Sequence, residues 1–288
     1  MSPRRWLVLR VRSPSGEEAG ALLTEGLLSL GGRAVWEERG WLLTHLPEPS
    51  DPEAFARRAR DRLAGLASPD LLELETEWQA HEDWAETWKR GLAPRRVTPR
   101  LVVTPSWIEP STVAGDVVVT LDPGMAFGNA EHGTTRGCLR LLDGVLRRGD
   151  RVLDLGAGSA VLSIAAVLLG AREAVAVEGD PLAWEAILEN VERNGVAGRV
   201  VLRREWATAA SLAALGGFDG AVANIERGAL ERLLPGIARS VGAGGWVVLS
   251  GVTDGDVADL TALAREGGLG PEAQDADGDW RSLLFRRA

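Results

Sequence analysis

Residues 152–166 read VLDLGAGSAVLSIAA, and this stretch decides the fold of the larger part of the chain. Residues 152–155 form a short apolar run typical of a buried strand, and helical spacing begins near Ser159. In an open α/β sheet, a ligand binds at such a turn, beyond the carboxyl ends of the strands. Gly156 and Gly158 permit a tight backbone turn and the close approach of a ligand. The stretch therefore predicts a strand, a ligand-binding turn and a helix.

Other short apolar runs, rich in valine, surround this stretch. They lie at residues 173–178, 199–203, 218–225 and 244–251, and helical stretches separate them. Near-continuous apolar strands that alternate with helices are typical of a parallel sheet covered on both faces. We therefore predict an α/β fold with a Rossmann-like sheet, and we expect a last strand at 279–287 (DWRSLLFRR) to close the sheet edge.

The spacing of the small residues in the turn distinguishes between possible ligands. A nicotinamide dinucleotide site requires a small residue at position 161, which is Val161. A phosphate-binding loop requires a lysine, and the chain's only lysine, Lys89, lies elsewhere. The alternative is a nucleoside without phosphates, which fits Asp154, Gly156 and Gly158, although the third small position holds Ala160. This pattern favours S-adenosylmethionine over NAD and leaves open a purely structural glycine turn.

An acidic residue ends the next predicted strand. Glu178 follows Gly158 by 20 residues, the distance at which a carboxylate accepts hydrogen bonds from both hydroxyls of a ribose. We therefore expect Gly156, Gly158 and Glu178 to bind the cofactor.

Three polar residues near these strands are further candidates. Asn224 ends a buried strand, so its amide either faces the reaction centre and positions an amine or caps the helix that begins at Arg227. His132 is either a base for the substrate amine or an imidazole that caps or orders the start of a helix at 133–146. Cys138 lies on an apolar helix face and is expected to be a buried thiol.

The first part of the chain shows a different order of elements. The predicted elements are a strand at 6–12, a helix at 15–30, strands at 34–38 and 41–46, a helix from Asp51 to about 66, and a strand at 71–79. This β-α-β-β-α-β order is typical of a small α+β, ferredoxin-like domain. We expect this domain at 1–78, an interdomain helix and linker with Trp84 and Trp88 at 79–100, and the Rossmann-like domain at 101–288.

Composition excludes several classes of function. The net charge is −9, with 32 Lys and Arg against 41 Asp and Glu, so direct nucleic-acid binding is not expected. One cysteine and three histidines without ligand spacing (His45, His81 and His132) argue against a metal site. No apolar run is long enough to span a membrane, and the start does not resemble a signal peptide. A cytoplasmic protein is expected.

Several longer motifs together resemble one enzyme family. They are EDWAETWKRGLAP (82–94), LDPGMAFGNAEHGTTRGCL (121–139), the stretch at 152–166, AVAVEGDP (174–181), NVERNG (190–195) and VANI (222–225). In order and spacing they resemble the methyltransferases of large-subunit ribosomal protein eleven, the PrmA family, over about residues 80–288. The resemblance implies a class I fold, and an enzyme that transfers methyl groups from S-adenosylmethionine to amino groups of that ribosomal protein and releases S-adenosylhomocysteine. It implies that the N-terminal domain recognises the substrate.

The resemblance also implies a set of cofactor contacts. These residues are Thr135, Gly156, Glu178 and Asn224, with Phe127 and the rest of the 122–130 loop covering the cofactor. The chain departs from the family pattern at Asn129-Ala130 (usually Thr-Gly), at Ala160 (usually Gly) and at Glu178 (usually Asp). These departures leave two alternatives open: a methyltransferase for another protein or a small molecule, and a catalytically silent binding protein.

Overall fold

The structure is a computed structural model of the 288-residue chain. It describes residues 5–12, 23–24, 26–27, 29–31, 35–38, 40–49, 51–64, 73–80, 92–122, 128 and 130–288. The chain divides into two compact units, Met1–Gly91 and Leu92–Ala288. The expected interdomain helix with Trp84 and Trp88 falls outside the described residues.

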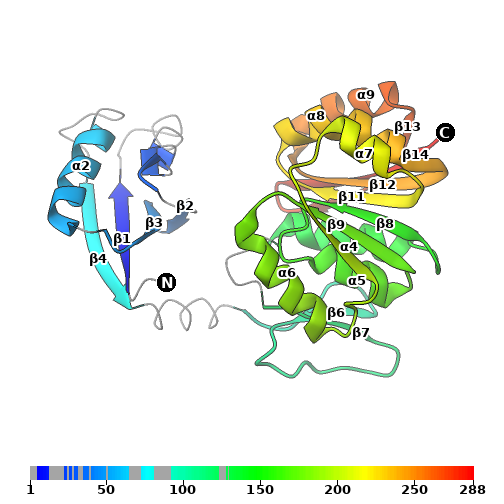
Figure 1. Ribbon diagram of the computed structural model, residues 1–288, viewed down its shortest axis with the longest axis horizontal. Helices are drawn as coiled ribbons and strands as arrows, with labels where there is room; N and C mark the ends of the chain where they lie inside the picture. The colour runs from blue at the N-terminus through cyan, green and yellow to red at the C-terminus, as the bar shows by residue number, and fades with distance from the viewer. Residues whose placement is uncertain are drawn as a thin grey trace. The chain divides into compact units, whose positions relative to one another are not determined.

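The N-terminal unit contains a four-stranded antiparallel sheet in the order β2-β3-β1-β4 (Figure 1). Its strands are β1 (Arg5–Arg12), β2 (Val35–Glu38), β3 (Trp41–Pro47) and β4 (Glu73–Ala80). Helix α2 (Pro52–Ala64) begins after Asp51, whose carboxylate accepts a 2.9 Å hydrogen bond from the amide of Ala54. The expected helix at 15–30 is described only in part, and residues 23–24, 26–27 and 29 are helical. The strand order is that of the predicted ferredoxin-like domain.

The C-terminal unit is built on a seven-stranded sheet in the order β10-β9-β8-β11-β12-β14-β13. Its strands are β8 (Arg151–Leu155), β9 (Glu173–Glu178), β10 (Val200–Arg204), β11 (Phe218–Asn224), β12 (Val241–Thr253), β13 (Leu269–Asp277) and β14 (Trp280–Arg287). Strands β8 to β12 pair in parallel, whereas β14 runs antiparallel to both of its neighbours. The predicted Rossmann-like sheet is confirmed.

The position of the last strand differs from the prediction. Strand β14 does not close the sheet, because β13 pairs with its outer side and forms the edge. The residues of β13 after Leu269 are mostly exposed, and the register shifts between Pro271 and Ala273. An exposed edge strand carries no apolar run, so this strand gave no hydrophobic signal in the sequence.

Helices cover both faces of this sheet (Figure 1). They are α4 (Gly133–Val145), α5 (Val161–Leu169), α6 (Pro181–Arg193), α7 (Ala209–Leu215), α8 (Arg227–Ser240) and α9 (Val257–Glu266), with a 3₁₀ turn, η2, at Asp254–Asp256. Successive strand residues point to opposite faces, so Val152 packs against α4 and α5 while Leu153 packs in the core formed with α7 to α9. None of the helices in the described parts of the chain has the length and apolarity to cross a membrane.

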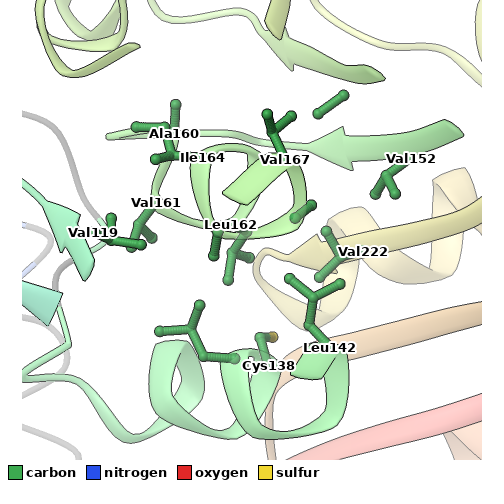
Figure 2. Packing of buried hydrophobic residues seen from close by; sticks show 14 of the residues in the cluster. Val119, Cys138, Leu142, Val152, Ala160, Val161, Leu162, Ile164, Val167 and Val222 are labelled. Carbon is green, nitrogen blue, oxygen red and sulfur yellow. The ribbon is translucent and has the colours of Figure 1, made fainter. Parts of the chain in front are cut away.

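A small three-stranded sheet adds to the first of these cores. It consists of β5 (Arg95–Arg96), β6 (Leu101–Thr104) and β7 (Val117–Thr120). Figure 2 shows Val119 of β7 beside Val161, in a cluster with Cys138 and Leu142 of α4. Because β5 pairs with β6, residues 95–96 are part of the C-terminal unit and not of a linker.

Candidate functional site

The turn after β8 has the backbone conformation that its glycines suggested. Gly156 and Gly158 have φ angles of 69° and 54°, in the left-handed region that favours glycine. A Cβ atom on Gly156 would lie 2.4 Å from the side chain of Ile225, which follows β11. Ala223 pairs with Leu155, so Asn224 and the turn lie side by side at the carboxyl ends of adjacent strands. The glycine turn after β8 and Asn224 at the end of β11 therefore lie together at the carboxyl ends of the parallel strands.

Ala160 takes the place of the third glycine. Its φ is 65°, and it is the one non-glycine residue with a positive φ among the described residues. Its methyl group is fully buried in the core beneath the turn (Figure 2). The methyl group therefore packs against the core and is not exposed at the surface of the turn. Ala130 is likewise buried and has no positive φ, so it does not strain the backbone.

Glu178 lies at the end of β9, beside the turn. Its Oε2 accepts a hydrogen bond from the amide of Gly158 at 2.9 Å, and its Oε1 accepts one from the amide of Asp180 at 2.8 Å. The amide of Gly156 donates to the carbonyl oxygen of Val177 at 2.9 Å, which fixes the turn to the same strand. A carboxylate can accept about four hydrogen bonds, so the two oxygens of Glu178 retain capacity for a ligand.

Asp154 is a second buried acid beneath the turn. Its Oδ2 accepts hydrogen bonds from the amide and the hydroxyl of Ser163, at 3.0 and 2.7 Å. Its Oδ1 has no hydrogen-bond partner among the described residues. Burial raises the pKa of Asp154 to about 6, and the charge of Glu178 contributes to this rise.

Thr135 and Asn224 lie close together at the carboxyl ends of the strands. The amide Nδ2 of Asn224 lies 3.4 Å from the hydroxyl oxygen of the buried Thr135, in the first turn of α4. The N-cap residue of α8 is Glu226, so the alternative in which Asn224 caps that helix is wrong. These two residues are 89 positions apart, so their contact has no local signal in the sequence.

His132 precedes α4 and lies against Trp280. Its Nδ1 is 2.7 Å from the hydroxyl oxygen of Thr134, and its ring centroid is 4.9 Å from that of Trp280. The side chain makes no capping hydrogen bond to α4. Burial lowers the pKa of His132, with a further contribution from Arg136, so the ring is neutral at neutral pH. These contacts favour a role in ordering the chain before α4.

The loop that was expected to cover the cofactor is described only at its ends. Phe127 and Asn129 fall outside the described residues. Gly128 has a φ of 103°, and its carbonyl oxygen accepts a hydrogen bond from the hydroxyl of Ser159 in the glycine turn. One described point of the loop therefore lies on the turn.

Cys138 is a packing residue, as expected. It is fully buried on α4 (Figure 2), and burial raises the pKa of its thiol to about 12. The thiol is protonated at neutral pH and is not a nucleophile. Among the described residues, no group of three His, Cys, Asp or Glu side chains lies close enough together to hold a metal ion.

Two further residues near the glycine turn were not identified from the sequence. The indole of Trp206 packs over Gly179, where an added Cβ would lie 2.3 Å from the ring, and 78% of its surface is exposed. An exposed tryptophan directly after a predicted strand was the available signal. Asn190 of α6 is fully buried and bonded to the carbonyl oxygen of Ser159 at 3.1 Å, but a lone asparagine on a helix resembles a surface residue in sequence.

Comparisons with known proteins show the family to which the chain belongs. The sequence profile of the ribosomal protein L11 methyltransferase (PrmA) family matches residues 35–288. The ribosomal protein L11 methyltransferase of Chloroflexus aurantiacus is 36% identical over 270 residues, which cover 86% of this chain and 82% of that protein. The protein of the same name from Streptococcus mutans is 34% identical over 251 residues, covering 85% of this chain and 78% of that protein.

A solved structure has the same fold. The crystal structure of a ribosomal protein L11 methylase from Lactobacillus delbrueckii subsp. bulgaricus matches with a TM-score of 0.62 and 27% identity, over 68% of this chain and 99% of that chain. The fold is thus that of the class I methyltransferases, with a small N-terminal domain added. On these grounds the chain belongs to the ribosomal protein L11 methyltransferase family.

Proposed function

We propose that this protein transfers methyl groups from S-adenosylmethionine to amino groups of ribosomal protein L11. Membership of the L11 methyltransferase family supports the reaction and the substrate. The observation that carries the choice of cofactor is the carboxylate of Glu178, held against the glycine turn at the carboxyl ends of the strands. Such an enzyme acts in the cytoplasm, and the proposal requires no contact with nucleic acid or a membrane.

The described residues fit the cofactor by the chemistry of their side chains and backbone. Glu178 keeps acceptor capacity for two ribose hydroxyls, because each of its oxygens accepts one backbone hydrogen bond. Gly156 and Gly158 carry no side chain that would stand between the ligand and the backbone. Thr135 and Asn224 complete the site on the far side of the turn, and Phe127 remains a proposed contact on the strength of the family resemblance.

Trp206 extends the proposed site beyond Glu178. The amide of Glu205 donates to the carbonyl oxygen of Glu178 at 3.1 Å, and the exposed indole of Trp206 packs over Gly179, the residue after Glu178. A flat, exposed ring at this place can stack on the adenine. We therefore include Trp206 among the proposed cofactor contacts.

The reaction requires few chemical groups from the protein. When bound, S-adenosylmethionine supplies a methyl group on a positively charged sulfur, and S-adenosylhomocysteine is the product. The accepting amine must first lose a proton, because an ammonium group with a pKa of ~10.4 has no lone pair. Asn224 donates from Nδ2 to Thr135, which leaves its carbonyl oxygen to accept a hydrogen bond from the amine and direct the lone pair. The protein therefore acts mainly by positioning.

The N-terminal unit is proposed to recognise the protein substrate. Its core contains residues of β1, β3 and α2 and is distinct from both cores of the C-terminal unit. The residues of the proposed cofactor site all belong to Leu92–Ala288. We place substrate recognition in residues 1–78, the region of the predicted ferredoxin-like fold.

A direct assay tests the proposal. The purified chain is incubated with ribosomal protein L11 and S-adenosylmethionine, and intact-mass spectrometry counts the methyl groups added; the N224A variant is the control. We expect methylated L11 from the wild type only. Cofactor binding without L11 methylation would favour another protein or a small molecule as substrate. Failure to bind S-adenosylmethionine would favour a silent binding protein. Family membership argues against both.

A further inference from the structure

Asn190 joins three segments of the chain from within the core. Its Oδ1 accepts a hydrogen bond from the amide of Asp122 at 2.9 Å, and its Nδ2 donates to the carbonyl oxygen of Asp122 at 3.1 Å. The same Nδ2 donates to the carbonyl oxygen of Ser159 in the glycine turn, also at 3.1 Å. Arg193, on the same helix, donates to Oδ1 at 2.7 Å and pairs with the carboxylate of Asp122 at 3.1 Å. The amide of Asn190 thus ties α6 both to the chain after β7 and to the turn.

The carbonyl group of Ser159 depends on this contact. Ser159 precedes Ala160, the N-cap residue of α5, so its carbonyl group lies outside the helix, and the amide of Ser163 donates to Asp154. Ser159 is fully buried, so its carbonyl oxygen cannot bind water in place of a protein donor. An unpaired buried carbonyl group is costly, and Asn190 supplies its donor.

Asn194, one helical turn later, makes a similar set of bonds without touching the turn. Its Oδ1 accepts from the amide of Thr120 at 2.9 Å, and its Nδ2 donates to the carbonyl oxygen of Thr120 at 2.6 Å. The same Nδ2 donates to the backbone oxygen of Asn190 at 2.7 Å. Asn194 therefore secures β7 to α6, whereas Asn190 also secures the glycine turn.

We propose that Asn190 is a positioning residue for the cofactor. By holding Ser159, it keeps the turn in the conformation in which the amide of Gly158 meets the carboxylate of Glu178. This inference rests on the proposed function, because it takes the turn to be the cofactor site. Asn190 acts through the turn and does not touch the cofactor.

The variants N190A and N194A form a matched pair for the test. Each removes an asparagine side chain with three backbone partners, so both should lower the melting temperature, N190A by more because Asn190 is fully buried and Asn194 is half-buried. Only N190A should weaken the binding of S-adenosylmethionine. Its Kd and KM for the cofactor should rise about tenfold, and its kcat at saturating cofactor should change little. A tenfold change corresponds to about 1.4 kcal/mol of binding free energy.

A third variant serves if N190A does not fold. N190D keeps the shape and the acceptor for the amide of Asp122, loses the donor to the carbonyl oxygens of Asp122 and Ser159, and places its charge beside Arg193. It should fold and show the same rise in Kd.

The outcomes separate this inference from the proposed function. Equal losses of affinity in N190A and N194A, or none in N190D, would overturn the positioning role of Asn190 while leaving the proposed function intact. Failure of the wild-type chain to bind S-adenosylmethionine would overturn both.

Discussion

The amide of Gly158 donates a 2.9 Å hydrogen bond to the carboxylate of Glu178, across 20 residues of sequence. The other carboxylate oxygen accepts from Asp180, so the acid is fixed at both oxygens before any ligand binds. The side chain of Glu178 reaches from the end of β9 to the glycine turn. Glu178 is therefore part of the structure of the turn as well as a candidate for the ribose contact.

The substitution Glu178→Gln tests this double role. The new amide nitrogen would face a backbone N–H group, so one hydrogen bond is replaced by two opposed donors. We expect the Kd for S-adenosylmethionine to rise by at least about tenfold and the free energy of unfolding to fall by about 1–3 kcal/mol. Calorimetry and urea unfolding measure the two effects. Glu173→Gln, at the other end of β9, is the control, because Glu173 pairs with Arg151 away from the turn. Equal affinities for the two variants would refute a cofactor role for Glu178.

Asp154 should make the stability of the protein depend on pH. Its folded-state pKa of about 6 lies above the ordinary value of 3.8, so the folded state favours the protonated acid. This preference for the protonated acid stabilises the folded state fully below about pH 4, and the stabilisation is lost as the pH rises through 6. A shift of this size corresponds to on the order of 2–3 kcal/mol.

The variant Asp154→Asn cannot ionise, which isolates this effect. As the pH rises from 4 to 7.5, its free energy of unfolding should increase relative to that of the wild type, because only the wild type loses the contribution of Asp154. The other titrating groups are the same in both proteins and cancel in the comparison. Urea unfolding at the two pH values measures the change. A difference between the two proteins that stays constant with pH would show that Asp154 titrates normally.

The sequence predicted most of the parts of the fold that have a hydrophobic pattern, although the short apolar strands β6 and β7 were not predicted. The core strands of the large sheet and the four N-terminal strands are apolar or alternating, and they lie where the pattern placed them. Strand β13 and the two-residue strand β5 have no such pattern, because their residues are mostly exposed and they form by pairing with a neighbour. Pairing partners far apart in sequence leave no local signal, so the sheet edge was assigned to the wrong strand.

The candidate site was predictable to a similar degree. Gly156, Gly158 and Glu178 follow from strand ends and glycine spacing, which are local features. The hydrogen bond between Asn224 and Thr135, and the role of Asn190, depend on which segments meet in space. Helix positions with polar side chains are normally solvated, so a buried asparagine cannot be told from a surface residue by its spacing.

Ala160 presents a balance of two opposing effects. A left-handed backbone costs an alanine about 1–2 kcal/mol, whereas burial of its methyl group contributes about 0.8 kcal/mol. Replacement by glycine removes both effects, so Ala160→Gly should change the free energy of unfolding by less than about 1 kcal/mol in either direction. Ala160→Val adds a β-branched side chain in the same backbone region and in a packed core, and it should cost more than about 2 kcal/mol.

Urea unfolding of the two Ala160 variants decides between packing and strain. A loss above about 2 kcal/mol in the glycine variant would mean that the methyl group is essential to the core. Cofactor affinity should stay near that of the wild type in the glycine variant, because the methyl group does not reach the crevice.

Substitution of Asn224 or Thr135 should lower turnover more than it lowers folding stability. Asn224→Ala removes the amide that is proposed to orient the amine, and we expect kcat to fall by at least about 100-fold with a small change in melting temperature. Thr135→Val keeps the shape and removes the hydroxyl oxygen that faces Asn224, so it should lower kcat less. Turnover on L11 and thermal melts measure the two variants. Parallel losses of activity and stability in Asn224→Ala would show that the residue is structural.

The last prediction separates the two units of the chain. Residues Leu92–Ala288 contain both cores of the large sheet and all described residues of the proposed cofactor site, so a chain that begins at Leu92 should fold and bind S-adenosylmethionine with an affinity close to that of the full protein. If the N-terminal unit recognises the substrate, the same chain should methylate L11 at least about tenfold more slowly, since binding energy from the substrate's remote surface is lost.

A second truncation, beginning at Leu101, is the control for the position of the cut. It also removes β5 and with it the hydrogen bonds from Arg95 to Glu131 and from Arg96 to Asp116, so it should be less stable than the first. Calorimetry, thermal melts and methyl incorporation compare the three chains. A truncated chain that methylates L11 at the rate of the full protein would place substrate recognition in the C-terminal unit, and a folded truncation that no longer binds the cofactor would place part of the cofactor site in the N-terminal one.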